Sequence, residues 1–401
     1  MPPIKAIVVD DSIVIRNLLS KILNADQDID VVATAANGSI ALRKIEQFKP
    51  DVIVLDVEMP VMNGLETLRN IRAQDRKTIV VMFSALTAKG ADATFDALNA
   101  GADDYEAKPS NLRNFTEAEK LITDGLVRKI KCLAKAREGK GRDLPKIGPS
   151  PFRMPGQARK KSTSLDSKET TNSTKKAPKK TRLAPLSAVR VRTDKPAKVE
   201  LVVIGVSTGG PEALRNLIPE LPKNFPVPIL VVQHMPAIFT KRMAERLDSL
   251  SPLTVREAYD SAVIKAGEVW IAAGDYHLEI RKRVGGHILR THQGPKENFS
   301  RPAVDVLFRS AAELFGANVL ATILTGMGED GLIGCHLISQ AGGQIISQDQ
   351  ATSVVWGMPG AVCKANLSEA ILPLKQISSE IIQRTNTSRS NQLTEKISQC
   401  R

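Results

Sequence analysis

Short apolar runs alternate with amphipathic stretches over residues 4–137 of the chain. The apolar runs predict buried strands, and apolar positions at helical spacing between them predict helices. The expected strands are Ile4–Val9, Val31–Ala35, Asp51–Leu55, Thr78–Phe83 and Asp104–Ala107. One expected helix contains Val14, Leu18 and Ile22, and two more run from about Ser39 to Phe48 and from Leu65 to Arg72. A fourth ends at Ala100, and a fifth begins near Phe115. Five such repeats predict an α/β fold with a doubly wound, five-stranded parallel sheet, whose site lies at the strand carboxyl ends.

A second series of apolar runs and helical stretches begins at Val199. The strands that it predicts are Val199–Val206, Pro228–Gln233, Gly267–Ala273, Asn318–Leu324 and Gln344–Ser347. Residues 277–293 differ, because two alternating runs flank Gly285-Gly286 and predict an antiparallel hairpin. The C-terminal half is therefore expected to be an α/β domain with a mainly parallel sheet and one antiparallel hairpin.

The segment between the two series is rich in Ser, Thr, Lys, Pro and Gly and has almost no aromatic residues. Such a composition cannot bury a core, so we predict a disordered linker at 138–198 between domains at 4–125 and 199–385. Residues 139–198 hold 17 Lys and Arg against four Asp and Glu, and so account for the whole formal net charge of +13. The basic character belongs to this linker, and the two domains together are neutral.

The rest of the composition excludes several classes of protein. No run of about 18 apolar residues is present, so we expect no membrane insertion. The N-terminus enters a strand directly and lacks the hydrophobic region of a signal peptide, which predicts a cytoplasmic protein. The cysteines are scattered without a Cys-x-x-Cys pair, so reduced thiols are expected, with Cys335 in the core.

Acidic residues close the predicted strands of the first domain. Asp10 and Asp11 follow the first strand and Asp56 follows the third, while Ser84 ends the fourth and Lys108 follows the fifth. Three carboxylates that meet at one sheet edge repel one another unless a hard cation such as Mg²⁺ lies among them. A lysine and a hydroxyl beside them suit a phosphoryl group on Asp56.

This set of residues, with Tyr105 shortly before Lys108, resembles the response-regulator receiver domain. The resemblance implies that Asp56 is the phosphoacceptor, that Asp10, Asp11 and Asp56 hold Mg²⁺, and that Ser84, Tyr105 and Lys108 form the switch. It also implies a histidine kinase as the phosphodonor.

In the second domain a strand ends in Gly205-Val206-Ser207-Thr208-Gly209, and an amphipathic helix follows. Glycines around a serine at a strand-to-helix corner allow a sharp turn that leaves the hydroxyl exposed, as in a hydrolase nucleophile elbow. The N–H groups and dipole of the helix start suit a developing oxyanion. A capping serine in a Gly-rich turn, or a phosphate cradle, is the alternative interpretation.

A serine nucleophile needs a base and a group that orients the base. His234 and Asp330 both follow predicted strands, so they can meet Ser207 at the same sheet edge. A structural role for His234 and a helix-capping role for Asp330 are the alternatives. The order Ser, His, Asp differs from the order Ser, Asp, His of the α/β hydrolases, so that superfamily fits poorly despite its similar elbow.

Five segments of the second domain together resemble the chemotaxis-specific protein-glutamate methylesterase family. They are Gly205–Gly210, Gln233–Pro236, Arg301–Asp305, Leu324–Gly331 and Gly357–Gly360. The resemblance implies an esterase without a cofactor that hydrolyses glutamate methyl esters, and deamidates glutamines, on the cytoplasmic helices of methyl-accepting chemoreceptors. Ser207 is then the nucleophile, His234 the general base and Asp330 the orienting group, with Thr208 and the Met327 backbone near the site.

Other interpretations follow from other features. A DNA-binding response regulator would use the basic linker on phosphates, but the second half lacks a terminal helix-turn-helix and no specific nucleic-acid partner is expected. A nucleotide-binding domain would need a phosphate-binding loop that the sequence lacks. The histidines His277, His287 and His292 lack partners at metal-ligand spacing, and Trp270 and Trp356 are expected to pack in the core or the cleft.

The long linker departs from the shorter connection of the family. Its lysines predict attraction to an acidic receptor bundle, and a solvated spacer is the alternative. These lysines are Lys160, Lys161, Lys175, Lys176, Lys179 and Lys180.

Overall fold

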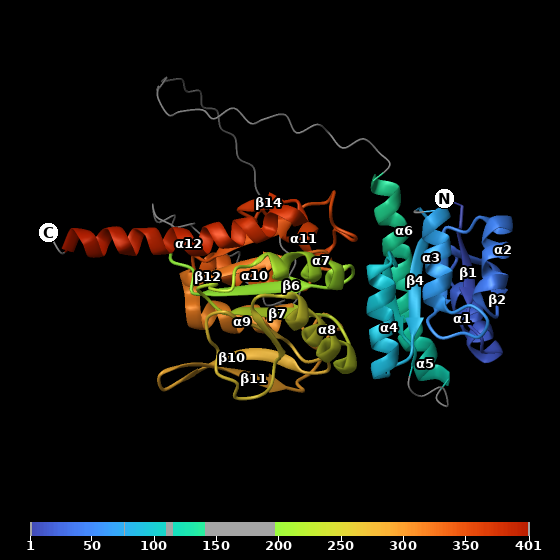
Figure 1. Cartoon of the computed structure of the whole chain (residues 1–401), viewed down its shortest axis with the longest axis horizontal. Coiled ribbons are helices and arrows are strands. Elements are labelled where there is room, and N and C mark those ends of the chain that lie inside the picture. The colour runs from blue at the N-terminus through green and yellow to red at the C-terminus, as the bar shows by residue number, and fades with distance from the viewer. Residues whose placement is uncertain (1, 76, 110–114, 141–196, 400–401) are drawn as a thin grey trace, which may run out of the picture.

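The computed structural model describes residues 2–75, 77–109, 115–140 and 197–399 as two α/β domains that face each other (Figure 1). The predicted linker lysines lie outside the described residues. Within the described part, no helix is both long enough and apolar enough to span a bilayer.

The N-terminal domain contains one parallel sheet with the strand order β2-β1-β3-β4-β5. Its strands are β1 (Ile4–Val9), β2 (Ile29–Ala35), β3 (Val52–Asp56), β4 (Ile79–Ser84) and β5 (Asp104–Ala107). The central strands β3 and β4 are buried along their whole length, as expected for a parallel sheet that is covered on both faces. The predicted doubly wound, five-stranded sheet is confirmed.

Among the described residues of this domain, six α-helices cover the sheet. They are α1 (Ile13–Asn24), α2 (Gly38–Phe48), α3 (Gly64–Gln74), α4 (Ala88–Asn99), α5 (Phe115–Ile122) and α6 (Arg128–Lys140). A π-helical turn at Thr123–Val127 joins α5 to α6, so the predicted last helix continues to Lys140. Gly125 lies in this turn against the Glu106 carboxylate, where a Cβ would come within 2.7 Å. α6 therefore covers the first residues of the predicted linker, and residues 141–196 lie outside the described chain.

The C-terminal domain contains a seven-stranded parallel sheet with the order β14-β13-β12-β6-β7-β9-β8. Its strands are β6 (Leu201–Val206), β7 (Ile229–Gln233), β8 (Thr254–Glu257), β9 (Glu268–Ile271), β12 (Val319–Ile323), β13 (Gln344–Gln348) and β14 (Ala370–Leu372). The sequence analysis missed β8 and β14, because both are short edge strands: β8 has only four residues of mixed polarity, and the apolar β14 has only three.

The predicted hairpin is present as a separate two-stranded sheet, β10 (His277–Arg283) and β11 (Gly286–His292). Its tight turn contains Gly285 at a φ of 83°, in the left-handed region that glycine adopts without steric cost. The helices of this domain are α7 (Gly210–Leu217), α8 (Ala237–Leu250), α9 (Val304–Phe315), α10 (Leu332–Gln340), α11 (Met358–Lys364) and α12 (Leu374–Gln399). The fold class predicted for this half is confirmed.

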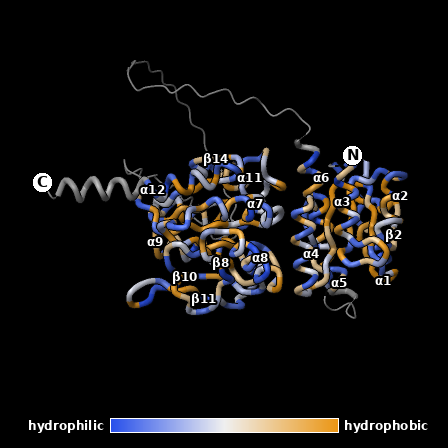
Figure 2. The backbone as a smooth tube through the Cα atoms, in the orientation of Figure 1, coloured by the Kyte–Doolittle hydropathy of each residue, from blue (hydrophilic) through white to orange (hydrophobic). Residues whose placement is uncertain are grey.

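Hydrophobic residues follow the strands through the middle of both domains and place the core there (Figure 2). Trp270 and Cys335 are buried in this core, as predicted. One cluster of buried apolar side chains continues from the N-terminal sheet into the helices of the C-terminal domain. The two domains are therefore in apolar contact.

Candidate active site and phosphorylation site

The turn that carries Ser207 follows the central strand of the C-terminal sheet. Its shape depends on glycine, because Gly209 has a φ of 76° and a Cβ there would come within 2.5 Å of Val354. The Ser207 N–H donates to Thr325 O at 3.0 Å, which fixes the turn to the segment after β12. α7 begins at Gly210, so its N-terminal dipole end lies beside the serine.

The neighbouring strands bring His234 and Asp330 to the same edge. β6 lies between β7 and β12, and Val206 pairs with Gln233 in the register. Ser207 and His234 are therefore the next residues along paired strands. His234 Nε2 lies 2.8 Å from Asp330 Oδ2. No hydrogen bond joins the Ser207 hydroxyl to His234 within the described chain, and such contacts commonly shorten when substrate binds.

Asp330 is buried, and its carboxylate accepts hydrogen bonds from the start of α9 and not from α10, the helix that follows it. Its Oδ2 accepts from the Val304 N–H at 2.7 Å and its Oδ1 accepts from the Asp305 N–H at 3.1 Å, both in the first turn of α9. Burial alone would raise the pKa of Asp330, but the hydrogen bonds from His234 and from these N–H groups hold it below its usual value. Asp330 therefore remains a carboxylate at neutral pH.

The capping alternative for Asp330 needs a correction. α10 begins after Gly331, which has a left-handed φ of 94° and no side chain to cap the helix. The cap comes from α9, where Asp305 Oδ1 accepts from the Gly334 N–H at 2.7 Å. Asp330, which lies just before α10, caps α9 in return. The two helices therefore exchange caps, and a sequence pattern does not indicate such an exchange.

The sequence analysis assigned no role to Asn298 or Gln233. Asn298 Nδ2 donates to both Asp330 Oδ1 and Asp305 Oδ2, at 2.8 and 2.9 Å. Gln233 Nε2 donates to Ser207 O at 2.9 Å and so links the strand before His234 to the serine turn. Gln233 precedes the histidine in one of the five motif segments, which was the only available signal.

The two remaining predicted residues also lie at this edge. Thr208 is buried, and its carbonyl accepts from the Thr325 hydroxyl at 2.9 Å. Met327 is half-buried in a hydrophobic cluster that includes residues of the N-terminal domain. Both residues therefore border the Ser207 turn through the segment after β12.

The acidic residues of the N-terminal domain meet as predicted. Asp10, Asp11 and Asp56 each offer an oxygen within 4.8 Å of the others, and this is the only such group that the described residues contain. Lys108 Nζ lies 2.8 Å from Asp10 and 2.9 Å from Asp56. Burial, together with the nearby Asp10 charge, raises the pKa of Asp56 to about 6 against the opposing effect of Lys108. Three carboxylate oxygens form a donor set that fits Mg²⁺.

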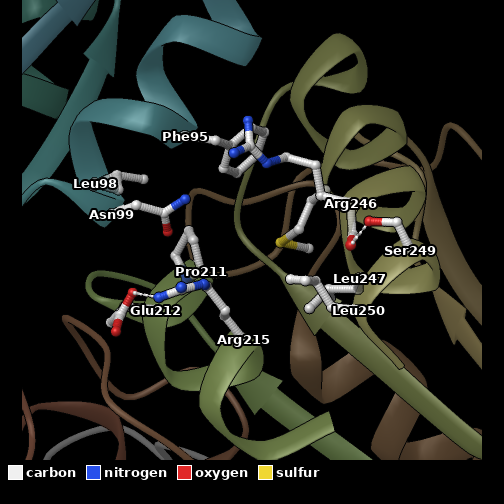
Figure 3. Close-up of a pocket in the computed structure, with 11 residues that line it drawn as sticks. Phe95, Leu98, Asn99, Pro211, Glu212, Arg215, Arg246, Leu247, Ser249 and Leu250 are labelled. Atoms are coloured by element: carbon white, nitrogen blue, oxygen red, sulfur yellow. Dashed lines mark hydrogen bonds and ion pairs between the residues drawn. The ribbon is translucent and has the colours of Figure 1, made fainter. Parts of the chain in front are cut away.

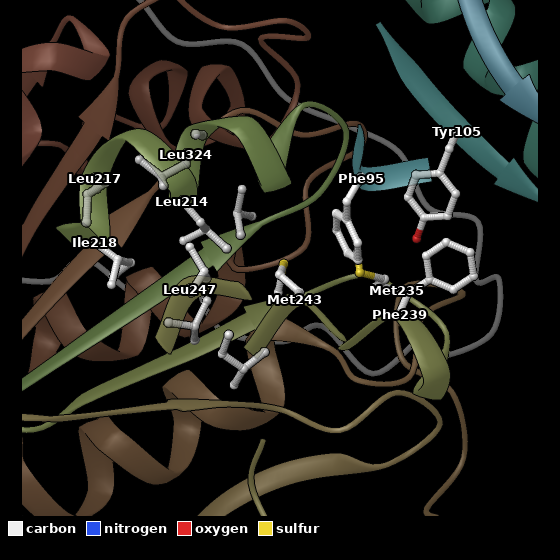
Figure 4. Packing of buried hydrophobic residues seen from close by; sticks show 14 of the residues in the cluster. Phe95, Tyr105, Leu214, Leu217, Ile218, Met235, Phe239, Met243, Leu247 and Leu324 are labelled. Atoms are coloured by element: carbon white, nitrogen blue, oxygen red, sulfur yellow. The ribbon is translucent and has the colours of Figure 1, made fainter. Parts of the chain in front are cut away.

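The two other residues predicted to form the switch face different neighbours. Ser84 is fully buried, and its hydroxyl donates to Gly90 O in the first turn of α4 at 3.0 Å. Tyr105 points out of the N-terminal domain and stacks on Phe239 of α8, with ring centroids 4.7 Å apart. Figure 4 shows Tyr105, Phe239 and Phe95 packed together at the junction of the domains.

The histidines of the hairpin have structural partners. His277 is buried, accepts from the Ala303 N–H and is within 2.8 Å of Pro295 O. His292 accepts from the Gly294 N–H, while His287 packs against Phe315. Within the described chain these histidines form no metal-ligand group.

The fold and these two sites define a class of protein: an α/β domain with a Ser-His-Asp arrangement, joined to a domain with the acidic pocket of a receiver. Two family patterns match, "CheB methylesterase" over residues 202–381 and "Response regulator receiver domain" over residues 6–120. The chain belongs to the CheB methylesterase family.

Individual relatives match almost the whole chain. A protein-glutamate methylesterase/protein-glutamine glutaminase of Trichodesmium erythraeum is 45% identical over 96% of this chain and 99% of its own length. One of Nocardioides sp. is 45% identical over 96% of both chains. The solved catalytic domain of the Thermotoga maritima CheB methylesterase is 46% identical over 47% of this chain and 99% of its own, with a TM-score of 0.46. None of these matches supports the DNA-binding alternative.

Proposed function

We propose that this chain hydrolyses glutamate methyl esters on chemoreceptor helices, deamidates glutamines at such positions, and is regulated by phosphorylation of Asp56. The observation that carries the proposal is the 2.8 Å contact between His234 and Asp330 beside the Ser207 turn. Membership of a family whose curated relatives are named for both activities supports the substrate class.

In this proposal the Ser207 hydroxyl attacks the ester carbonyl carbon and gives its proton to His234. Asp330 accepts the Nε2–H of the imidazole, so Nδ1 is the nitrogen left to take that proton. The N-terminal end of α7, with the Thr208 and Met327 backbones, lies where an oxyanion develops.

Collapse of this adduct expels methanol, which receives the proton from His234, and leaves an acyl-enzyme on Ser207. Water, activated by the same imidazole, then releases glutamate and restores the serine. A glutamine substrate follows the same steps with ammonia as the leaving group, so one triad serves both reactions.

The acidic pocket supports Asp56 as the phosphoacceptor. Asp10, Asp11 and Asp56 would hold Mg²⁺, which neutralises phosphoryl charge when bound. Lys108 already spans Asp10 and Asp56 and supplies a second positive charge. The phosphodonor is then a chemotaxis histidine kinase or a small phosphodonor.

We predict that Mg²⁺ stabilises the chain above about pH 7 and much less at pH 5. The raised pKa of Asp56 means that the folded state binds a proton more tightly than the unfolded state, so this carboxyl destabilises the fold as pH rises through about 6. Bound Mg²⁺ offsets the negative charge of Asp56, and it can do so only while that carboxyl is ionised. Differential scanning calorimetry across pH with and without Mg²⁺ measures the effect. Asp56→Asn should abolish the Tm increase caused by Mg²⁺, and the exposed control Asp30→Asn should not. A Tm increase that is independent of pH would contradict Asp56 as a magnesium ligand.

The contact between the domains supports inhibition by the unphosphorylated receiver. Tyr105, Glu106 and Lys129 of the receiver line a cavity of about 370 Å³ together with His234. The receiver thus covers one side of the histidine. Substrate as wide as a receptor helix needs this face open.

α4 supplies most of the polar contacts across the interface. Arg246 of α8 lies 2.6 Å from Asp96 and donates to Asp92 O at 3.2 Å, while its guanidinium stacks over Phe95. A cavity of about 190 Å³ remains between α4, α7 and α8 beside these residues (Figure 3). The interface is therefore incompletely packed, which suits a contact that must open.

Ser84 connects the phosphorylation site to this interface. Its hydroxyl is bound to Gly90 at the start of α4, the helix that carries Phe95 and Asp96. If the hydroxyl turned to a phosphoryl group on Asp56, α4 would lose that anchor. Phosphorylation would thereby weaken the docking of the receiver.

We predict that Arg246→Asp raises methanol release without phosphodonor roughly three- to tenfold, because it replaces an attraction to Asp96 by repulsion. The exchange Asp96→Arg with Arg246→Asp should restore inhibition, and Arg256→Asp, in a pair within the catalytic domain, should change nothing. Methanol release from methylated receptor fragments, with and without a small phosphodonor, measures this. If Arg246→Asp were as inactive as the unphosphorylated wild type while phosphodonor still activated it, this contact would not be inhibitory.

The same assay tests the proposed function itself. Methanol release from methylated receptor that increases with phosphodonor is the expected result. Retention of DNA at physiological salt without any methanol release would favour the DNA-binding alternative instead.

A further inference from the structure

The loop before α9 has an unusual backbone. Asn298 and Phe299 follow one another at φ values of 50° and 63°, both in the left-handed region that side chains larger than glycine adopt rarely. Two consecutive residues of this kind persist only where the surrounding structure requires them. Asn298 is also the residue that reaches the catalytic aspartate.

The Asn298 amide lies between two buried carboxylates. Asp330 and Asp305 are 2% and 1% exposed. Burial and the Asp330 charge raise the pKa of Asp305. Asn298 Nδ2 donates one hydrogen bond to Asp330 Oδ1, at 2.8 Å, and one to Asp305 Oδ2, at 2.9 Å. The two protons of one amide therefore separate two like charges.

Each oxygen of Asp330 has its own set of partners. Oδ2 receives His234 and the Val304 N–H, while Oδ1 receives Asn298 and the Asp305 N–H. The donors on Oδ1 determine the rotation of the carboxylate, and this rotation determines whether Oδ2 stays in line with the imidazole. Without the amide, repulsion from Asp305 would turn the Asp330 carboxylate.

We propose that Asn298 is a positioning residue for the triad, which keeps Asp330 Oδ2 directed at His234 while its second N–H donates to Asp305. This inference rests on the proposed function. The role is performed by the N–H donors of the amide and not by the shape of the loop. Asn298 itself does not touch the substrate.

Glycine and aspartate separate these two possibilities, because both adopt the left-handed conformation readily. Asn298→Gly removes the donors with the rest of the side chain but keeps the left-handed backbone accessible, and Asn298→Asp replaces the donors with an acceptor of the same shape. Asn216→Ala is the matched control, since Asn216 also donates from Nδ2 to two acceptors, on the exposed side of α7. All variants are made in the full chain and assayed with excess small phosphodonor, so that receiver docking does not limit the rate.

For Asn298→Gly we expect kcat for a glutamate methyl ester peptide to fall roughly 10- to 100-fold with KM close to wild type, and Tm to fall moderately because two buried carboxylates lose a donor. Asn298→Asp should be slower still at pH 8. Its deficit relative to wild type should shrink as the pH is lowered, because the neighbouring Asp330 and Asp305 carboxylates favour the protonated form of the introduced carboxyl, which can donate. Asn216→Ala should match the wild type throughout.

Wild-type kcat in both Asn298 variants would overturn the proposal and leave only a role in loop shape. A low Tm for Asn298→Asp alone would leave the decision to Asn298→Gly. Ser207→Ala in the same assay separates this proposal from the proposed function. Methanol release that survives Ser207→Ala overturns the triad, whereas an inactive Ser207→Ala with a fully active Asn298→Gly overturns only the positioning role.

Discussion

We expect Ser207→Ala to lower methanol release from methylated receptor by roughly a thousandfold or more, since the proposed nucleophile is lost and triad members act as a unit. The fold should not change, because Gly209 and the Ser207 N–H bond to Thr325 determine the turn. We expect a Tm within error of the wild type. His234→Ala should lose a comparable amount of activity.

Methanol release and calorimetry on the same preparations check this expectation. Ser379→Ala is the control, because Ser379 lies in α12 of the catalytic domain and its hydroxyl binds only Gln376 O. Near-wild-type methanol release by Ser207→Ala would contradict the serine mechanism.

Asp330→Asn should reduce both activity and stability. Both oxygens of Asp330 accept hydrogen bonds, from His234, Asn298 and the first turn of α9. An asparagine would replace one of these oxygens with an NH₂ group, which would face N–H donors and could not accept from them. The imidazole then loses the partner that sets its tautomer, and activity falls roughly 10²- to 10⁴-fold. The free energy of unfolding should fall by about 1–3 kcal/mol, as expected when buried donors lose their acceptor.

The stability difference should depend on pH in a defined direction. The folded state holds the pKa of Asp330 below its usual value, so this carboxylate stabilises the fold above the unfolded pKa of about 3.9. The difference from Asp330→Asn should be complete above about pH 5 and shrink as the pH falls below 4. Urea titrations at several pH values measure it. A stability loss that is the same at pH 3 and pH 7 would contradict the role of the charge.

The central strands and the triad could be predicted from the sequence for one reason. Ser207, His234 and Asp330 each end or follow a continuous apolar run, and parallel strands bring their carboxyl ends to one edge. The pattern of apolar runs therefore predicts both the parallel sheet and the residues that lie together at its carboxyl edge. The assignment of their catalytic roles remains a prediction until the variants are measured.

Asn298 and Asp305 could not be predicted in the same way. Their importance arises from hydrogen bonds between α9, α10 and the loop before α9, and no hydrophobic period encodes such a contact. An isolated Asn in a loop is typical of turns in general. Only the packing of the two helices shows that this amide meets two carboxylates.

The receiver illustrates the same limit at a larger scale. Asp10, Asp56 and Lys108 could be predicted as one pocket because each follows a strand of one sheet. That Tyr105 would stack on Phe239 depends on how two separate domains dock, and the sequence pattern of either domain alone carries no information on it.

The exchange of caps between α9 and α10 has a consequence for how this family can change over time. In the proposed mechanism Ser207 contributes its hydroxyl to chemistry alone, so a lineage that no longer needs the esterase can lose the serine in a single neutral step. Asp330 also holds the start of α9, so selection for a folded, abundant protein keeps it after the activity has gone. Descendants that survive only as phosphorylation-responsive binding proteins should therefore retain the aspartate and vary at the serine.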